Sequence, residues 1–409
     1  MTLTADPTLS PKSFPLVEIG DLVEFRRGLT YKKSDEVESS NTGVLRANNV
    51  DLATGQLDLS DIRYLTDKVE VPQARKLATD SLLICTASGS RAHLGKMAHI
   101  ANAPDLAFGG FMGLLVPKPE VSARYIWYFS RSEAYRDYLD SLAPGANINN
   151  LRFDDLAGLV LPLPSIDEQK RIVAVLDQAF AALDRARANA VVNVVDAEEI
   201  FLRATEKVLE DLIREGSTRP LADVAEHCLG KMLDKNKNTG RARPYLRNIN
   251  VRWFEVDQSD VLEMRIEDSE VERYSVRRGD LLICEGGYPG RAAIYDSDEP
   301  TFFQKALHRV RFESAGLANV VMYWLYVQSK TGALNEHFSG TGIQHFTGQT
   351  LARFHVPVAS ERAMRDAAHR LGELRIALDE LSTELKRKQA DITDLRQSLL
   401  QAAFSGQLT

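Results

Sequence analysis

Two short segments of this 409-residue chain carry residue patterns that are familiar from enzymes. The segment "FSGTG" at Phe338–Gly342 fits the Phe-x-Gly-x-Gly loop that holds S-adenosylmethionine. Glu168 and Lys170, with Asp154 and Asp155 upstream, supply half of the signature of a metal-dependent nuclease, whose carboxylates bind Mg²⁺. Methyl transfer and phosphodiester cleavage are therefore the two reactions to weigh.

Neither pattern has the surroundings that its chemistry requires. The loop of a methyltransferase should follow a buried parallel strand, whereas "FSGTG" follows "TGALNEH", which is not a strand pattern. Glu168 lies where a helix is expected to begin, and capping of that helix explains it. The eight histidines form no zinc-ligand spacing, and no Walker loop or Gly-x-Ser-x-Gly elbow occurs. The sequence predicts a protein that is not an enzyme and holds no metal or cofactor.

Cysteine usage and hydropathy indicate the compartment. Three cysteines, at positions 85, 228 and 284, are far apart and odd in number, which suits a reducing cytoplasm. Cys85 and Cys284 end two "LLIC" segments and are expected to be buried. No run of 18 apolar residues is present, so no membrane partner is expected. We predict a cytoplasmic protein.

Charge is distributed unevenly along the chain. The formal net charge is −7, which by itself disfavours a nucleic-acid partner. Yet Lys231–Arg252 carries seven Lys or Arg against one acid, Asp234. Such a strip predicts a phosphate-binding surface.

An internal repeat of about 200 residues gives the domain organisation. "LRANNV" at Leu45–Val50 matches "LRNINV" at Leu246–Val251, and "LLIC" recurs at Leu82–Cys85 and Leu281–Cys284. Each "LLIC" is followed by a small-residue loop and an arginine. Each copy mixes strand and helix patterns. A period this long indicates a duplicated domain and not a solenoid.

Each copy is followed by a long helical pattern. Ser165 with Glu168 forms a capping box after Pro164, and no proline or glycine follows as far as Glu215. Apolar residues recur at alternating steps of three and four in both segments, which predicts a coiled coil. The second helix has the cleaner seam, which includes Leu371, Leu378, Leu381, Leu385 and Leu395.

The fold class that follows is α+β, with two duplicated domains separated by two long helices that form an antiparallel coiled coil. We expect the first domain at 1–164, a central spacer helix at 165–215, the second domain at 216–360 and a C-terminal spacer helix at 361–409.

Candidate DNA-contacting residues lie in basic or amide-rich turns. Asn can read adenine and Arg can read guanine through paired hydrogen bonds. The alternative for the asparagines is a polar turn in which they bond local backbone, and for the basic clusters a solvated surface. The candidates are Arg26, Arg27, Lys32, Lys33, Arg46, Asn48, Asn49, Arg91, Lys235, Lys237, Arg241, Arg243, Arg247, Asn248, Asn250 and Arg291. Those between 235 and 243 are expected in a strand-poor segment that contacts phosphate flexibly.

Over essentially its whole length the chain resembles the specificity subunit of Type I restriction–modification systems. "LVLPLPSIDEQKRIVAVLD" matches that family's proline-then-"EQ" junction, and "SLLQAAFSGQLT" at Ser398–Thr409 matches its helix ending. The second junction, "VPVASERAM", departs from the pattern.

The resemblance implies a sequence-specific subunit that binds double-stranded DNA. Each recognition domain reads one half of a bipartite site, and the helices set the spacing and dock two modification subunits. Those partners bind S-adenosylmethionine and methylate adenine, and restriction subunits join to cleave. The alternative function is a catalytically active DNA methyltransferase or nuclease with fused recognition domains.

Overall fold

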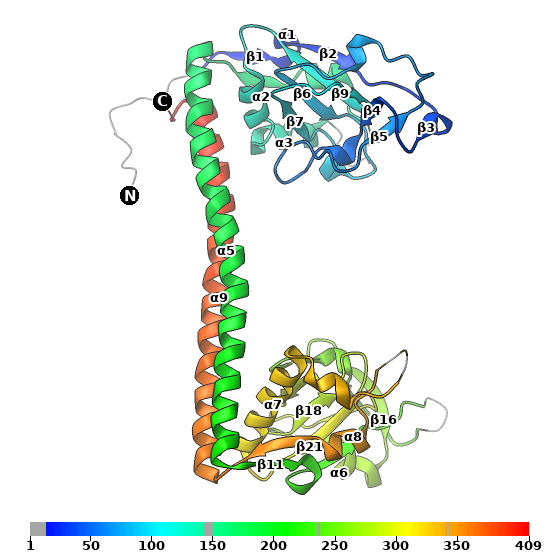
Figure 1. The fold of residues 1–409 in the computed structure, drawn as a ribbon, viewed down its shortest axis with the longest axis vertical. Coiled ribbons are helices and arrows are strands. Elements are labelled where there is room, and N and C mark those ends of the chain that lie inside the picture. The colour runs from blue at the N-terminus through cyan, green and yellow to red at the C-terminus, as the bar shows by residue number, and fades with distance from the viewer. Residues whose placement is uncertain (1–13, 143–149, 235–237, 341, 343, 409) are drawn as a thin grey trace. The chain divides into compact units, whose positions relative to one another are not determined.

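The computed structural model describes residues 14–142, 150–234, 238–340, 342 and 344–408. The chain divides into two compact units (Figure 1). The first unit comprises Met1–Asn189 and Lys388–Thr409, and the second comprises Ala190–Arg387. Each unit therefore contains one copy of the repeat and a part of each long helix.

The first unit is built on two four-stranded sheets. One is antiparallel, in the order β2 (Val23–Arg27), β9 (Met112–Pro117), β6 (Ser81–Cys85) and β7 (Met97–Ile100). The other has the order β3 (Glu36–Val37), β5 (Arg63–Leu65), β4 (Thr42–Leu45) and β8 (Ala107–Phe108), in which β4 and β8 are parallel. All five residues of β6 are buried, as expected for the "LLIC" segment at the centre of a sheet.

The second unit repeats this arrangement. Its first sheet has the order β12 (Glu226–Leu229), β21 (Leu307–Arg311), β18 (Leu281–Cys284) and β19 (Ala292–Ile294). Its second sheet has the order β16 (Leu262–Ile266), β13 (Arg241–Leu246), β20 (Thr301–Phe303) and β17 (Ser275–Val276), with β13 and β20 parallel. β14 (Val251–Arg252) and β15 (Glu255–Val256) form a small ribbon.

One close backbone crossing identifies equivalent positions in the two units. A Cβ on Gly28 would lie 1.9 Å from the carbonyl oxygen of Gly109, and a Cβ on Gly230 would lie 2.2 Å from that of Gln304. Any side chain at either position would push the two segments apart. The predicted duplicated α+β fold is confirmed.

Short helices complete each unit. In the first unit they are α1 (Ile19–Leu22), α2 (Ala123–Phe129), α3 (Glu133–Ser141) and α4 (Phe153–Ala157). In the second unit they are α6 (Val271–Tyr274), α7 (Ala315–Lys330) and α8 (Gly348–Arg353). Four aromatic side chains of α2 and α3 are buried in the first core and serve packing, namely Tyr125, Trp127, Tyr128 and Tyr135.

The two long helices are α5 (Ile166–Glu215) and α9 (Glu361–Phe404). Ile172 and Leu176 near the start of α5 share a core with Leu400 and Ala403 near the end of α9. In the second unit Leu212, near the end of α5, shares a core with residues at the start of α9. The predicted antiparallel pairing is therefore confirmed (Figure 1).

The seam between the helices differs from the sequence pattern at two leucines. Leu371, Leu378 and Leu385 are buried as predicted. Leu381 is 45% exposed and Leu395 is 48% exposed. A lone pair of helices buries only the side chains at the centre of the seam, so flanking apolar positions stay open to solvent.

A hydrogen-bonded clamp joins the first recognition copy to α5. Ser165 Oγ accepts from the Glu168 N–H, as the capping motif predicted. The next residue, Gln169, is fully buried. Its Oε1 accepts from the Ser122 N–H at 2.9 Å, and its Nε2 donates to the Glu120 and Pro164 carbonyls at 3.0 and 2.9 Å.

The second copy attaches to its helix by apolar packing instead. Two strand pairs precede the helices: β1 (Leu16–Glu18) with β10 (Val160–Pro162), and β11 (Ser217–Pro220) with β22 (His355–Val358). Counting from the capping serines Ser165 and Ser360, Met364 stands where the first junction has Gln169. Met364 is 3% exposed within the second core. The second junction, "VPVASERAM", therefore has an apolar contact of Met364 at the position where the first junction has the hydrogen bonds of Gln169.

Candidate nucleic-acid interface

A pocket on the first unit brings several predicted residues together. It has a volume of about 560 Å³ and lies between the β2–β3 connection, the turn after β4 and the turn before β9. Lys33, Arg46 and Asn48 line it with Tyr31 and Phe111. Cation, amide and aromatic side chains on one concave surface are the combination that binds and reads nucleic acid.

The turn that carries Arg46 is held by Asn49. Asn49 Oδ1 accepts from the Arg46 N–H at 2.8 Å, and Nδ2 donates to the Asp58 and Asp61 carbonyls at 2.8 and 3.0 Å. The residue is 1% exposed. Its amide is thus saturated by backbone and removed from solvent.

The second unit contains the same turn. Asn250 Oδ1 accepts from the Arg247 N–H at 2.8 Å, and Nδ2 donates to the Asp257 and Asp260 carbonyls at 2.9 Å each. Asn250 is 2% exposed. The prediction that Asn49 and Asn250 read bases is therefore wrong, because each amide is buried and already bonded to backbone.

The arginines of the two turns are exposed enough to bind but are paired. Arg46 Nη2 lies 3.0 Å from an Asp61 carboxylate oxygen, and Asn48 Nδ2 donates to the same oxygen at 2.8 Å. Arg247 Nη2 lies 2.7 Å from an Asp260 carboxylate oxygen. In both arginines Nε is buried without a hydrogen-bond partner among the described residues. The acid orients each guanidinium and leaves donors available.

The arginine loops after the two central strands are arranged differently. Arg291 Nη2 donates to the Asn248 carbonyl at 2.8 Å, and Asn248 Nδ2 donates to the Gly286 carbonyl at 3.1 Å. Arg291 also lies 4.0 Å from the centre of the Tyr288 ring. Arg91 instead donates to Asp140 on α3 at 3.1 Å. In the second unit, Arg291 is therefore hydrogen-bonded to the "LRNINV" turn. In the first unit, Arg91 is bonded to Asp140 instead of the corresponding "LRANNV" turn.

The basic strip is more ordered than the sequence indicated. Arg241 and Arg243 lie in strand β13, so the prediction of a strand-poor segment is wrong for them. The Arg243 guanidinium also lies 5.3 Å from the centre of the Phe302 ring and 3.5 Å from an Asp268 oxygen. β13 is held by backbone hydrogen bonds to β16 and β20. Those partners lie further along the chain, so the pattern of the strip itself does not reveal the strand. Lys235 and Lys237 lie outside the described residues.

The remaining candidates lie along β2 and the segment after it. Arg26 forms a two-point ion pair with Glu24, at 2.8 and 3.2 Å. That carboxylate raises the pKa of the Arg26 guanidinium, chiefly through the side-chain hydrogen bond. Arg27, Lys32 and Lys33 are exposed. Of this cluster, only Lys33 is among the residues that line the 560 Å³ pocket.

The enzyme-like segments do not assemble a reaction centre within the described residues. Phe338 follows a 3₁₀ turn at Ala333–His337, as the sequence indicated, and part of "FSGTG" lies outside the described residues. No group of three or more His, Cys, Asp or Glu among the described residues is placed to hold a metal ion. Burial raises the pKa of the Cys284 thiol to about 11, which keeps it protonated and unreactive.

No described helix is long and apolar enough to cross a bilayer.

Comparison with known proteins shows what this chain is similar to. The family model of the Type I restriction modification DNA specificity domain matches residues 11–193. The EcoKI specificity subunit of Escherichia coli (strain K12) is 24% identical, over 98% of this chain and 90% of the relative. The StySPI specificity subunit of Salmonella potsdam is 25% identical over the same shares. Residues 11–193 therefore match that domain family, and over 98% of its length the chain is similar to specificity subunits of Type I restriction enzymes.

Solved structures share the fold of this chain. A chain from a structural study of type I R-M complex assembly has a TM-score of 0.79 at 16% identity, covering 98% of this chain and all of that one. The HsdS subunit of Thermoanaerobacter tengcongensis has a TM-score of 0.61 at 15% identity, covering 99% and 100%.

Two exposed aromatic residues of this chain were not among the sequence candidates. Phe111 is 71% exposed and lines the first pocket, and Tyr288 is 61% exposed beneath Arg291. Phe111 follows two glycines, and Tyr288 lies within "EGGYPG". The sequence signal that could have identified them is an aromatic residue next to glycines, because a glycine-rich turn lies at the surface and rarely buries a large side chain.

Proposed function

We propose that this chain binds double-stranded DNA and selects its sequence for a Type I restriction–modification complex. Each unit reads one half of a bipartite site, and the helix pair sets the gap between the halves. The observation that carries the proposal is the repeated turn, in which a buried asparagine holds Arg46 or Arg247. Arg46 lines a pocket with the exposed Phe111, and in the second unit Asn248 of the turn is hydrogen-bonded to the loop that carries Tyr288.

Different side chains of this surface are suited to different parts of DNA. Lys33 is exposed and is suited to a backbone phosphate, which attracts any cation regardless of sequence. Asn48 and Arg46 carry donors in fixed orientations, which suit base edges. Phe111 and Tyr288 offer faces on which a base or sugar can pack.

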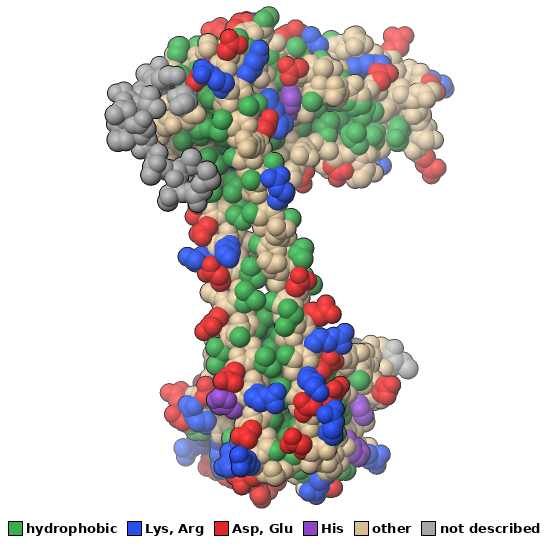
Figure 2. All heavy atoms as spheres, turned by 60° about the vertical axis from the view of Figure 1, so that its left-hand side comes forward, with side chains coloured by type: hydrophobic (Ala, Val, Ile, Leu, Met, Phe, Trp, Pro, Cys, Tyr) green, Lys and Arg blue, Asp and Glu red, His purple; other side chains and the backbone are tan. Residues whose placement is uncertain are grey.

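Partners of this chain are proposed to be two modification subunits and, through them, restriction subunits. An apolar patch formed by Val191, Val192 and Val195 on α5 supports this, with exposed fractions of 51%, 54% and 61%. Figure 2 shows hydrophobic side chains gathered along the paired long helices. Exposed valines on a charged helix are costly in water and are typical of a surface that another helix covers.

Catalysis is assigned to the partners. The modification subunit holds S-adenosylmethionine and transfers the methyl group, and this chain itself holds no cofactor. All these subunits are proposed to work in the cytoplasm, where the cell's DNA and reduced cysteines are found.

Exchanging residues 216–360 for those of a relative with another target tests the proposal. One half of the methylated motif is expected to change while the other half and the gap stay the same, because each unit has its own core. Methylome sequencing of a host that expresses the whole complex reads both halves at once. A change in both halves together would contradict independent reading.

Substitutions in the first pocket separate phosphate binding from base reading. Lys33→Ala is expected to weaken binding to every duplex and to lower the slope of log affinity against log salt by about one unit. Asn48→Ala is expected to cost about 1–3 kcal/mol on the cognate duplex alone. Salt titrations of binding on cognate and scrambled duplexes measure both effects. Lys170→Ala, on the exposed start of α5, is the control; equal losses for Lys170→Ala and Lys33→Ala would show that the pocket does not bind DNA.

A further inference from the structure

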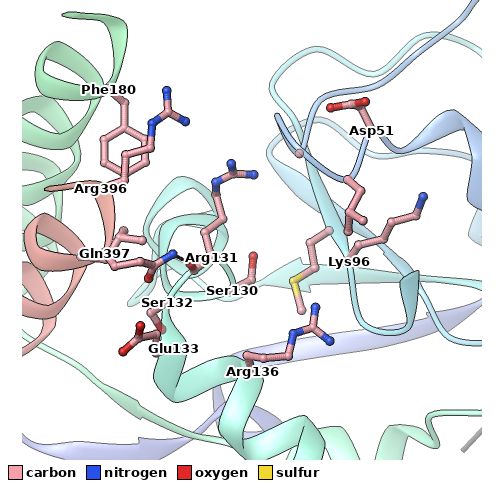
Figure 3. Close-up of a pocket in the computed structure, with 14 residues that line it drawn as sticks. Asp51, Lys96, Ser130, Arg131, Ser132, Glu133, Arg136, Phe180, Arg396 and Gln397 are labelled. Carbon is pink, nitrogen blue, oxygen red and sulfur yellow. Dashed lines mark hydrogen bonds between the residues drawn. The ribbon is translucent and has the colours of Figure 1, made fainter. Parts of the chain in front are cut away.

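A second pocket of the first unit lies apart from the candidate DNA-contacting residues. It has a volume of about 360 Å³ and is formed by the segment after β4, the α2–α3 turn and the long helices. Figure 3 shows Arg131 standing between Phe180 and Arg396 on one side and Asp51 and Lys96 on the other. A pocket of this size matches the lower end of the range for small-molecule sites, about 300–1,000 Å³.

Three cations that line this pocket have no carboxylate partner. Lys96 Nζ donates to the Val50 carbonyl at 2.6 Å, and Arg131 Nη2 donates to the Ala53 carbonyl at 2.6 Å. Arg136 Nη1 donates to the Leu94 carbonyl at 3.5 Å. Among the described residues, no Asp or Glu oxygen lies within 4.0 Å of their side-chain nitrogens. Backbone carbonyls orient these groups, and Asp51 attracts Lys96 and Arg131 without an ion pair within 4.0 Å.

The pocket as a whole is positively charged. Its lining holds four cations, the fourth being Arg396, and two carboxylates, Asp51 and Glu133, which leaves a net charge of +2. Arg396 is paired with Asp184, yet its Nε is buried without a partner among the described residues. Burial lowers the pKa of Arg131, and repulsion by Arg396 lowers it further. An anion in the pocket would relieve that repulsion.

The second unit fills the corresponding place with aromatic side chains. After the shared "NV" of the turn, Leu52 and Ala53 of the first copy correspond to Trp253 and Phe254 of the second. Phe254 lies 4.9 Å from the rings of both Tyr323 and Tyr326, and Arg375 of α9 lies 4.8 Å from the Phe254 ring. The same framework is therefore stable with this space filled, so the opening in the first unit is not a requirement of the fold.

We propose that this pocket binds a small phosphate-bearing molecule of about the size of a nucleoside phosphate. Phosphate carries the double negative charge that the lining lacks, and guanidinium groups bind it at two points. Leu52, Met97 and Leu400 supply an apolar wall for the remainder of the molecule. Lys96 is only 8% exposed, which places it too deep for the backbone of a rigid duplex and favours a free molecule as the source of the phosphate.

Isothermal titration of the full chain with pyrophosphate and with ATP tests the site. Both ligands are expected to bind. Arg136→Gln removes a charge-assisted hydrogen bond and is expected to weaken binding about tenfold or more. Leu52→Trp copies the second unit at an exposed position and is expected to remove binding by filling the space, with the melting temperature unchanged. Arg185→Gln, an exposed arginine elsewhere on α5, should bind as the unaltered chain does.

Three results would overturn the proposal. One is that the unaltered chain binds neither pyrophosphate nor ATP. Another is that Leu52→Trp and Arg136→Gln bind both ligands with unaltered affinity, which would place the anions on other basic surfaces. The last is that these variants instead weaken binding to duplex DNA of every sequence and lower its salt slope, which would make the pocket a contact for the DNA backbone.

Discussion

Replacing both Val192 and Val195 with lysine is expected to abolish DNA methylation by the assembled complex. DNA binding by this chain is expected to stay unchanged. Both valines are exposed on α5, Val192 by 54% and Val195 by 61%. If a modification subunit covers them, two buried ammonium groups cost several kcal/mol, and about 1.4 kcal/mol is worth a factor of ten in affinity. We therefore expect assembly to weaken by about a hundredfold or more.

Co-purification with the modification subunit and a methylation assay measure the effect. Asn193→Lys is the control, because it adds an exposed lysine in the same turn of the helix. At about 100° per residue its side chain lies on another face of the helix than the two valines. Assembly that tolerates both lysines but fails with Asn193→Lys would move the docking surface to the other face.

Phe201→Ala is expected to lower the free energy of unfolding of the second unit by about 3–5 kcal/mol. Phe201 is 3% exposed and packs against the rings of Phe254, Tyr323 and Tyr326, with centroids 6.2, 6.4 and 5.7 Å away. The truncation leaves a cavity between α5 and the recognition copy. Hydrogen exchange at the β18 amides reports this loss in the second unit itself.

Leu381→Ala serves as the comparison for Phe201→Ala. The heptad pattern places Leu381 in the helix seam, whereas the structure leaves it 45% exposed. We expect its truncation to cost less than about 0.5 kcal/mol, as is usual at the surface. Similar protection losses for the two variants would show that Leu381 is buried in solution and that the sequence pattern describes the seam better.

The sequence by itself determined the parts of this protein that depend on short-range patterns and on repetition. Heptad spacing, the Ser165 cap and the prolines before it defined both long helices, because a helix is specified by neighbours three and four residues apart. The repeated "LLIC" segments marked the central strands β6 and β18, since a continuous apolar run must be buried. Duplication then implied two equivalent units without any knowledge of contacts.

Only the tertiary structure decided which side chains of those units are free to bind. Asn48 and Asn49 are adjacent in sequence, yet one faces the pocket and the other is sealed inside its turn by Asp58 and Asp61. Arg91 and Arg291 follow equivalent strands, but Arg91 donates to the Asp140 carboxylate and Arg291 donates to the Asn248 carbonyl. The 360 Å³ pocket is lined by Leu52 together with Phe180 of α5 and Arg396 of α9, which lie more than a hundred residues away in the chain. Burial, pairing and cavity space arise from residues distant in the chain, so no local pattern encodes them.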